Sequence, residues 1–239
     1  MFINYAHRGA SDYAPENTLA AFYLGLQMGA NGIETDIQRT KDGILILFHD
    51  DSLDRITRQT GSVRDYTFQE LSEILIYGNR GQELRPDRIV TLDTFLFLFG
   101  HLDLTLALEF KNSMIEHEVL AMTKQYGVTD KCIFTSFVFD DLLRMRREDS
   151  CVSLGYLTGE VNDKLFNDML HNNIQQLCVC AEIITPELVE QCHRQNLSVR
   201  AWGVRDVDVM KHVVECGVDG GMTVNFPDKL SELLKQDKA

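Results

Sequence analysis

The sequence of 239 residues has few basic side chains for its size. Its 23 lysines and arginines are outnumbered by 36 aspartates and glutamates, which gives a formal net charge of −13. Nucleic acids and anionic membranes are bound through basic surfaces, so we expect neither as the main partner. A small anionic substrate remains compatible with this charge, because a metal ion and a few local cations are enough to hold one.

The sequence also lacks a long apolar run. A membrane-spanning helix needs about 20 apolar residues, and the longest run, near Phe97, is far shorter. The first apolar run, from Met1 to Ala6, leads directly into a histidine and does not look like a signal peptide. We therefore expect no stable membrane insertion and a cytoplasmic location.

Paired cysteine motifs are absent as well. The six cysteines are scattered through apolar segments without the C-x-x-C spacing of zinc and redox sites. We interpret them as reduced, buried thiols rather than a disulfide framework; they are Cys132, Cys151, Cys178, Cys180, Cys192 and Cys216.

From Thr91 onward, short apolar strands alternate with helices. Nearly continuous apolar strands in such an alternation predict a parallel sheet that is covered on both faces. The expected strands are 104–110, 132–136, 152–157, 176–180 and 198–204, and the expected helices are 92–99, 115–126, 140–147, 164–171, 186–195 and 207–216.

Further strands lie toward both ends of the chain. Apolar runs end near His7 and Asp36, a helix follows at 19–29, and a last apolar element covers 218–224. Eight parallel strands in this length are typical of a (β/α)8, or TIM, barrel, an α/β fold whose sites lie at the carboxyl ends of the strands. We expect one domain over 1–239, with a small insertion after the second strand, at about 50–90, that holds a helix at 68–75.

Two acidic residues stand close together in the second expected strand. Glu34 and Asp36 are two residues apart, so their side chains point to the same side of a sheet. The strand that ends near Phe110 carries a second pair with the same spacing but opposite charges, Glu109 and Lys111. An ordinary salt bridge is one interpretation of that pair. The other is that Glu109 joins the first two carboxylates in a site of hard oxygen ligands, suited to Mg²⁺ or Ca²⁺, with Lys111 placing a charge near a phosphate.

A tight turn is expected after the second strand. Asp42-Gly43 is the strongest two-residue signal for a hairpin turn with positive φ at both central positions, and it predicts a returning strand at 44–48. If Lys41 faces Ile44, the numbers of paired residues sum to 85. His49 would then lie opposite Asp36.

Two histidines stand at the ends of apolar strands, where barrel enzymes place acid and base groups. A strand-end histidine is often structural, but His7 and His49 both adjoin the carboxylates, so we interpret them as a catalytic pair. Trp202, the only tryptophan, is either a core residue or an apolar wall for a small organic group.

Several motifs together resemble those of the glycerophosphodiester phosphodiesterase family, over nearly the whole chain. They are His-Arg-Gly at 7–9, Pro-Glu-Asn-Thr at 15–18, Glu-x-Asp at 34–36, Thr-Lys-Asp-Gly at 40–43, His-Asp-x-x-Leu-x-Arg-x-Thr at 49–57, Leu-Glu-Phe-Lys at 108–111, Trp202 and Val-Asp-Gly at 218–220.

The resemblance implies a metal-dependent hydrolase that converts glycerophosphodiesters into sn-glycerol 3-phosphate and an alcohol. It implies one divalent cation on three carboxylates and an acid/base pair of two histidines. It also implies that two basic side chains bind the substrate phosphate. The residues are Glu34, Asp36 and Glu109 for the metal, His7 and His49 for catalysis, and Arg8 and Lys111 for the phosphate.

Two positions depart from the family pattern. Asn225 stands where the family often has aspartate, and we expect this change to affect only the barrel rim. Leu92 stands in a Val-Thr-Leu context where the family commonly has Ile-Pro-Thr-Leu, so Val90 takes the place of the proline. We expect the missing proline to loosen the exit from the insertion.

Two other functions fit the same motifs. A related barrel phosphodiesterase acting on lysophospholipids would need an exposed apolar groove or loop near the mouth, and the insertion is mostly polar. A binding module that has lost catalysis is the other, although every residue that the chemistry needs is present.

Overall fold

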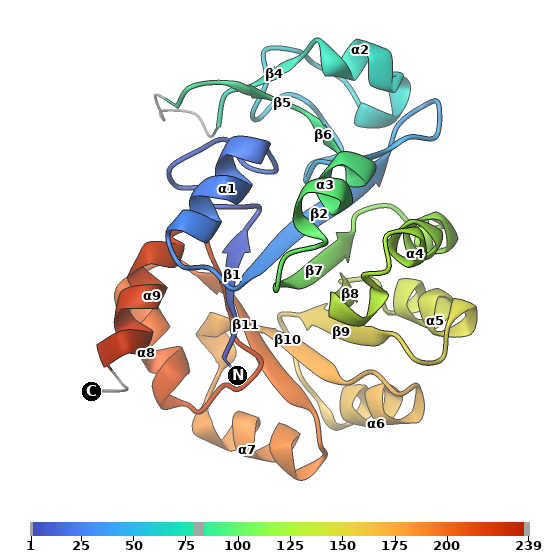
Figure 1. Ribbon diagram of the computed structural model, residues 1–239. Helices are drawn as coiled ribbons and strands as arrows, with labels where there is room; N and C mark the ends of the chain where they lie inside the picture. The colour runs from blue at the N-terminus through green and yellow to red at the C-terminus, as the bar shows by residue number, and fades with distance from the viewer. Residues whose placement is uncertain (1, 79–83, 237–239) are drawn as a thin grey trace.

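The computed structural model describes residues 2–78 and 84–236, so residues 79–83 of the expected insertion lie outside it. Within the described residues, eight parallel strands close into a barrel, because β1 pairs with both β12 and β2. The expected (β/α)8 fold is confirmed (Figure 1). The barrel strands are β1 (Asn4–His7), β2 (Gly32–Arg39), β7 (Thr105–Phe110), β8 (Cys132–Ser136), β9 (Ser153–Thr158), β10 (Gln176–Cys180), β11 (Ser198–Val204) and β12 (Met222–Val224).

Helices surround the barrel, and all but one were expected within about two residues of their ends (Figure 1). They are α1 (Leu19–Gln27), α3 (Leu92–Phe99), α4 (Glu116–Gln125), α5 (Phe139–Glu148), α6 (Asp163–His171), α7 (Pro186–Arg194), α8 (Val207–Glu215) and α9 (Pro227–Gln236). The exception is α9, which starts at Pro227 and buries Leu230. Proline at the first helical position is typical of a helix start.

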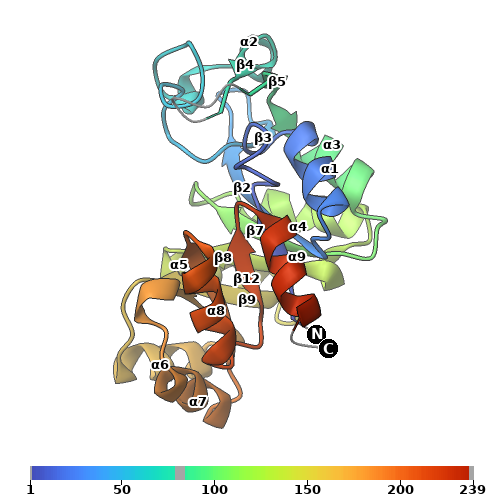
Figure 2. The same cartoon turned by 90° about the vertical axis from the view of Figure 1, so that its left-hand side faces the viewer.

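The segment between β3 (Leu45–Leu47) and α3 lies at one edge of the barrel (Figure 2). It contains η1 (Val63–Asp65), α2 (Phe68–Ser72), β4 (Leu75–Ile76), β5 (Asp87–Arg88) and β6 (Val90–Thr91). The helix expected at 68–75 is shorter than predicted, since its regular turns end at Ser72.

Two separate apolar clusters form the core. The larger one joins barrel strands and their helices. The smaller one lies under the inserted segment and begins with Ile46 and Phe48 of the returning chain; it also contains Leu53, Ile56, Val63, Leu71, Ile74, Ile76 and Ile89. The cysteines are unpaired and mostly buried as expected, but Cys151 is exposed.

The expected hairpin register is wrong by one residue. Gln38 pairs with Ile46, so paired numbers sum to 84. Within the turn, only Gly43 has positive φ, at 88°. With this register the loop has three residues between Thr40 and Ile44. The physical reason is a set of side-chain bonds: the Asp42 carboxylate accepts from the Thr40 hydroxyl at 2.6 Å and from the Phe68 amide at 2.9 Å. These bonds hold Asp42 out of the conformation that a two-residue turn requires.

The exit from the insertion is also firmer than expected. Val90, where the family commonly has proline, belongs to β6 and pairs with Leu47 of β3. Its side chain is buried. The prediction of a loosened exit is therefore wrong, since sheet pairing holds this position.

Candidate active site

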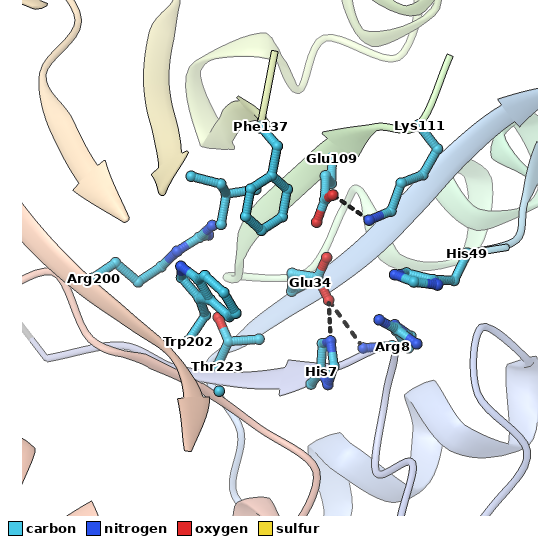
Figure 3. Close-up of a pocket in the computed structure, with 12 residues that line it drawn as sticks. His7, Arg8, Glu34, His49, Glu109, Lys111, Phe137, Arg200, Trp202 and Thr223 are labelled. Atoms are coloured by element: carbon cyan, nitrogen blue, oxygen red, sulfur yellow. Dashed lines mark hydrogen bonds and ion pairs between the residues drawn. The ribbon is translucent and has the colours of Figure 1, made fainter. Parts of the chain in front are cut away.

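A cavity of about 270 Å³ opens at the carboxyl ends of the barrel strands. Seven of the eight predicted site residues line it, and Figure 3 shows most of them pointing toward a common centre. The eighth, Asp36, is fully buried beside them. The lining residues among those predicted are His7, Arg8, Glu34, His49, Glu109, Lys111 and Trp202.

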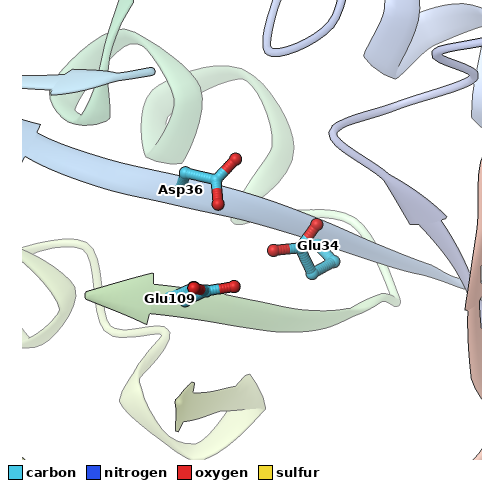
Figure 4. Close-up of side chains that lie close together, drawn as sticks. All are labelled: Glu34, Asp36 and Glu109. Atoms are coloured by element: carbon cyan, nitrogen blue, oxygen red, sulfur yellow. The ribbon is translucent and has the colours of Figure 1, made fainter. Parts of the chain in front are cut away.

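Three buried carboxylates meet on two neighbouring strands (Figure 4). The parallel register sets Asp36 of β2 level with Glu109 of β7, and Glu34 lies two residues earlier on the same face. One oxygen from each lies within 4.8 Å of the others. This geometry is what the alternation along β2 predicts.

The donor atoms in this cluster fit a divalent cation. Among the described residues, the buried Oε1 atom of Glu34 has no hydrogen-bond partner, and Oδ1 of Asp36 has only an ion pair with Lys111 at 3.4 Å. Burial and the charges of Asp36 and Glu109 raise the pKa of Glu34 well above its usual range. Burial and the charge of Asp36 raise the pKa of Glu109 to about 7. Carboxylate oxygens that lie this close together and repel one another suit a hard cation such as Mg²⁺ or Ca²⁺.

Arg8 enters the site through a sharp turn after β1. Both Arg8 and Gly9 have positive φ, and a Cβ on Gly9 would lie 2.4 Å from the backbone of Ala21. Glycine is therefore required there, where α1 packs against the turn. The Arg8 guanidinium lies 3.0 Å from Asp36 and 2.9 Å from Glu16.

Lys111 reaches the same carboxylates from the end of β7. Its ammonium pairs with Glu109 and lies 3.4 Å from Asp36. Burial lowers the pKa of Lys111, but these two carboxylates outweigh burial and raise it. Burial alone would raise the pKa of Asp36, and the cations Arg8 and Lys111 instead hold it well below the usual range.

His7 is fixed by a residue more than two hundred positions away. Its Nδ1 atom lies 2.6 Å from Oδ1 of Asn225. The amide nitrogen of Asn225 donates to the Asp12 carboxylate at 3.1 Å, so the amide oxygen faces His7. Because that oxygen can only accept, the hydrogen-bond network assigns the ring proton to Nδ1. The Nε2 lone pair is then directed toward the cavity, 3.9 Å from Glu34.

The expectation that Asn225 affects only the rim is therefore wrong. Burial and the nearby Arg8 charge lower the pKa of His7 to about 4, although 32% of its side chain stays exposed in the cavity and water moderates the effect. A neutral His7 with a free Nε2 is suited to accept a proton.

His49 has a different partner. Its Nδ1 atom lies 2.5 Å from the Asp50 carboxylate, which also pairs with Arg55 at 2.5 Å. Arg55 in turn lies 2.7 Å from Glu16, the residue that holds Arg8. The motifs at 15–18 and 49–57 contain these three supporting residues, Glu16, Asp50 and Arg55. Their contacts with His49 and with Arg8 were not predicted.

His49 reaches the cavity although the register differs from the prediction. The backbone leaves the β2 ladder after Leu47, and its last bond is from the Phe48 amide to the Asp36 carbonyl, at 3.0 Å. The Gln38 amide then donates to the carbonyls of Phe48 and Asp50 at 3.0 and 2.6 Å. These bonds turn the chain so that the imidazole faces the carboxylates.

Asn17 supports the carboxylate cluster from the loop before α1. Its amide nitrogen donates to Asp36 at 2.9 Å, and its amide oxygen accepts from Thr35 at 2.7 Å. The backbone of Asn17 has positive φ, a conformation that asparagine tolerates better than most residues. The Pro-Glu-Asn-Thr motif is thus part of the site.

Trp202 forms one wall of the cavity together with Phe137, which was not predicted. The rings meet edge to face with centroids 5.2 Å apart, and the indole donates to the Cys178 carbonyl at 3.1 Å. Phe137 directly follows the end of β8, and that strand-end position was the available signal. Arg200, also not predicted, lines the cavity beside Trp202.

Comparisons with known proteins agree with this geometry. Residues 7–229 match the Glycerophosphoryl diester phosphodiesterase family. The chain belongs to this family. A glycerophosphodiester phosphodiesterase from Caldanaerobacter subterraneus is 32% identical and covers 97% of each chain. Another from Bacillus altitudinis is 31% identical over 98% of each.

Solved structures share the fold of this family member. An Oleispira antarctica phosphodiesterase, in complex with the product sn-glycerol-3-phosphate, is 25% identical, with a TM-score of 0.86 and coverage of 97% of this chain and 96% of that one. A glycerophosphodiester phosphodiesterase from Agrobacterium tumefaciens has a TM-score of 0.85 at 23% identity, with coverage of 97% and 100%. The resemblance seen in the motifs is confirmed. None of the described helices is long and apolar enough to cross a membrane.

Proposed function

We propose that this phosphodiesterase-family protein hydrolyses glycerophosphodiesters, such as glycerophosphocholine, to sn-glycerol 3-phosphate and an alcohol. The observation that carries the proposal is that two imidazoles, His7 and His49, converge on one carboxylate cluster in a single cavity. The product complex of the Oleispira antarctica relative supports the glycerol phosphate half of the substrate.

We further propose one Mg²⁺ or Ca²⁺ on Glu34, Asp36 and Glu109. A divalent ion there supplies positive charge at the phosphoryl oxygens and makes a nearby hydroxyl easier to deprotonate. Arg8 and Lys111 are close enough to bind the phosphate as well. Each already neutralises part of the carboxylate charge, so the site accepts an anion despite the acidity of the whole chain.

We assign the base to His7 and the acid to His49. Nε2 of His7 takes the proton of the attacking hydroxyl, which comes from the glycerol 2-position or from water. Burial and the charges of Arg8 and Lys111 lower the pKa of His49, whereas the carboxylates of Asp36 and Asp50 favour its imidazolium. In this form His49 protonates the leaving alcohol oxygen as its bond to phosphorus breaks. When the 2-hydroxyl attacks, a second step with water opens the cyclic diester and the two imidazoles exchange roles.

The test is the release of glycerol 3-phosphate from a panel of glycerophosphodiesters with choline, ethanolamine, glycerol or inositol as the alcohol. Turnover of at least one by purified protein with Mg²⁺ or Ca²⁺ is expected. A protein that binds these diesters without any turnover would be a binding module instead.

A second candidate substrate is a lysophospholipid. Phe137, which lines the cavity, and its neighbour Val138, both in the loop after β8, are 45% and 50% exposed. These two residues supply a short apolar surface after β8, outside the mostly polar insertion, and this surface supports a lipid substrate. Release of lysophosphatidic acid from lysophosphatidylcholine, compared with glycerophosphocholine, separates the two candidates.

A further inference from the structure

Arg200 is a cation at the floor of the cavity that the proposed chemistry does not use. It lies on β11, level with Cys178 of β10 and two residues before Trp202 on the same face. Only 1% of its surface is exposed, and its guanidinium sits 5.0 Å over the Tyr5 ring. Despite this burial it lines the cavity.

The guanidinium has the Tyr5 hydroxyl and the Cys178 thiol as its polar neighbours. Its Nε and Nη1 atoms are buried without a hydrogen-bond partner among the described residues. The hydroxyl of Thr223, which lines the cavity as well, is also buried and unpartnered. Leaving such groups unpaired is costly, so the floor is built to receive hydrogen-bond acceptors and donors from a ligand.

A purely electrostatic role for Arg200 does not account for these donors. Burial lowers the pKa of Arg200, and Cys178 and Tyr5, followed by Glu34 and Glu109, outweigh burial and raise it. However, Arg200 forms no ion pair within 4.0 Å in the part of the chain that the structure describes. Its donors are therefore not occupied by the metal carboxylates.

We propose that Arg200 and Thr223 form a subsite for the terminal hydroxyl of the substrate's glycerol. This inference rests on the proposed function. Figure 3 shows Arg200 and Thr223 on one side of Glu34, and Arg8, His49 and Lys111 on the other. A phosphate held between the latter groups directs the rest of the glycerol toward Arg200. A cationic alcohol such as choline is kept out of this end by repulsion between like charges.

The test is a cycle that removes the guanidinium from the protein and the hydroxyl from the substrate. Wild type and Arg200→Met are assayed with glycerophosphocholine and with the phosphocholine ester of propane-1,2-diol, which keeps the hydroxyl next to the phosphate and lacks the terminal one. A hydrogen bond to a charged donor corresponds to a loss of about 10- to 100-fold in kcat/KM. We expect that loss for Arg200→Met with glycerophosphocholine, and much less with the deoxy substrate.

Arg205→Met is the matched control, because Arg205 is 66% exposed and pairs with Glu182; it should behave as wild type with both substrates. Equal losses for Arg200→Met with the two substrates would mean that Arg200 acts on the phosphate or on the metal cluster. That result would overturn the subsite. No loss with either would overturn it too. Wild-type turnover of glycerophosphocholine tests the proposed function separately.

A second measurement keeps the inference testable if Arg200→Met does not fold. A crystal structure of the wild-type protein with sn-glycerol 3-phosphate should show a guanidinium nitrogen of Arg200 within hydrogen-bond distance of the terminal hydroxyl oxygen. A ligand whose terminal hydroxyl faces solvent, away from Arg200, would contradict the subsite whether or not the enzyme is active.

Discussion

The Nδ1 atom of His7 lies 2.6 Å from the amide oxygen of Asn225. Because the amide nitrogen is held by Asp12, this contact sets both the orientation and the tautomer of the ring. His49 is held by a carboxylate instead. The two imidazoles therefore differ in the charge of their partners, and that difference favours a base at His7 and an acid at His49.

The first prediction concerns Asn225. Asn225→Leu should lower kcat about 10-fold or more with little change in the unfolding temperature, because His7 loses the acceptor that keeps its proton on Nδ1. Nitrogen-15 chemical shifts of the imidazole report the tautomer directly. Asn225→Asp restores an acceptor and should recover part of the rate. An unchanged tautomer in Asn225→Leu would show that other contacts fix the ring.

The second prediction separates the two histidines. Each of His7→Ala and His49→Ala should lose about 10² to 10⁴ in rate, and the double variant should be little worse than the poorer single one. With glycerophospho-p-nitrophenol, whose leaving group needs no proton, His49→Ala should recover most of its loss and His7→Ala should not. The opposite pattern would reverse the acid and base roles. His101→Ala, on the surface, is the control.

The third prediction concerns Asp50, which supports His49 and contacts Arg55. Burial raises the pKa of Asp50, but Arg55 and His49 outweigh it and the pKa is lowered. Its ionised form thus stabilises the fold above the unfolded pKa of about 3.9, and this contribution is lost as the pH falls through the folded pKa.

Asp50→Asn should therefore be less stable than wild type at pH 7, and the difference should shrink toward pH 3. Its kcat should fall about 10- to 100-fold, the range for partners that orient a functional histidine. Thermal unfolding at several pH values and steady-state kinetics measure both effects. Asp54→Asn, an exposed change in the same segment, should alter neither; equal kinetics for the two variants would remove Asp50 from the mechanism.

The fourth prediction is that turnover depends on one divalent cation. Chelation should abolish activity, and Mg²⁺ or Ca²⁺ should restore it, because three buried carboxylates otherwise repel one another. Calorimetry should show one binding site that Glu34→Gln weakens at least 10-fold and the exposed variant Glu215→Gln leaves intact. Full activity in excess chelator would contradict the metal site.

The fifth prediction is that Lys111→Ala weakens substrate use more than folding. The Lys111 side chain is 16% exposed, and its ammonium contacts two carboxylates that the proposed metal would also neutralise. Its loss therefore leaves no uncompensated charge once the cation is bound. KM for glycerophosphocholine should rise about 10-fold with a small change in unfolding temperature. A large drop in that temperature with normal kinetics would make Lys111 structural.

The positions of the barrel strands and of the three carboxylates follow from local patterns in the sequence. Apolar strands end at polar side chains, and the spacing of Glu34 and Asp36 sets their common face. Contacts between distant segments could not be predicted in the same way. Asn225 meets His7 only because β12 closes the barrel against β1, which places residues 218 positions apart side by side.

Other errors have similar causes. The turn at Gly43 depends on a bond from the Phe68 amide to Asp42, which no local turn rule includes. Arg200 stands two residues before Trp202, so alternation along the strand puts both on one face, but the sequence left open whether Trp202 faces the core or the cavity. The helix Pro227–Gln236 has leucines at helical spacing, so the sequence pattern was sufficient to predict it.

The two apolar clusters have a consequence for how the enzyme loses activity. His7 extends from a strand of the larger cluster, whereas His49 directly follows Phe48 of the smaller one. Local unfolding often follows such divisions. Opening of the smaller cluster alone would withdraw His49, the proposed proton donor, while the three carboxylates and His7, the proposed base, stay in place. Heat should then first disable cleavage of diesters with poor leaving groups, at temperatures where the barrel still stands and p-nitrophenyl diesters are still cleaved.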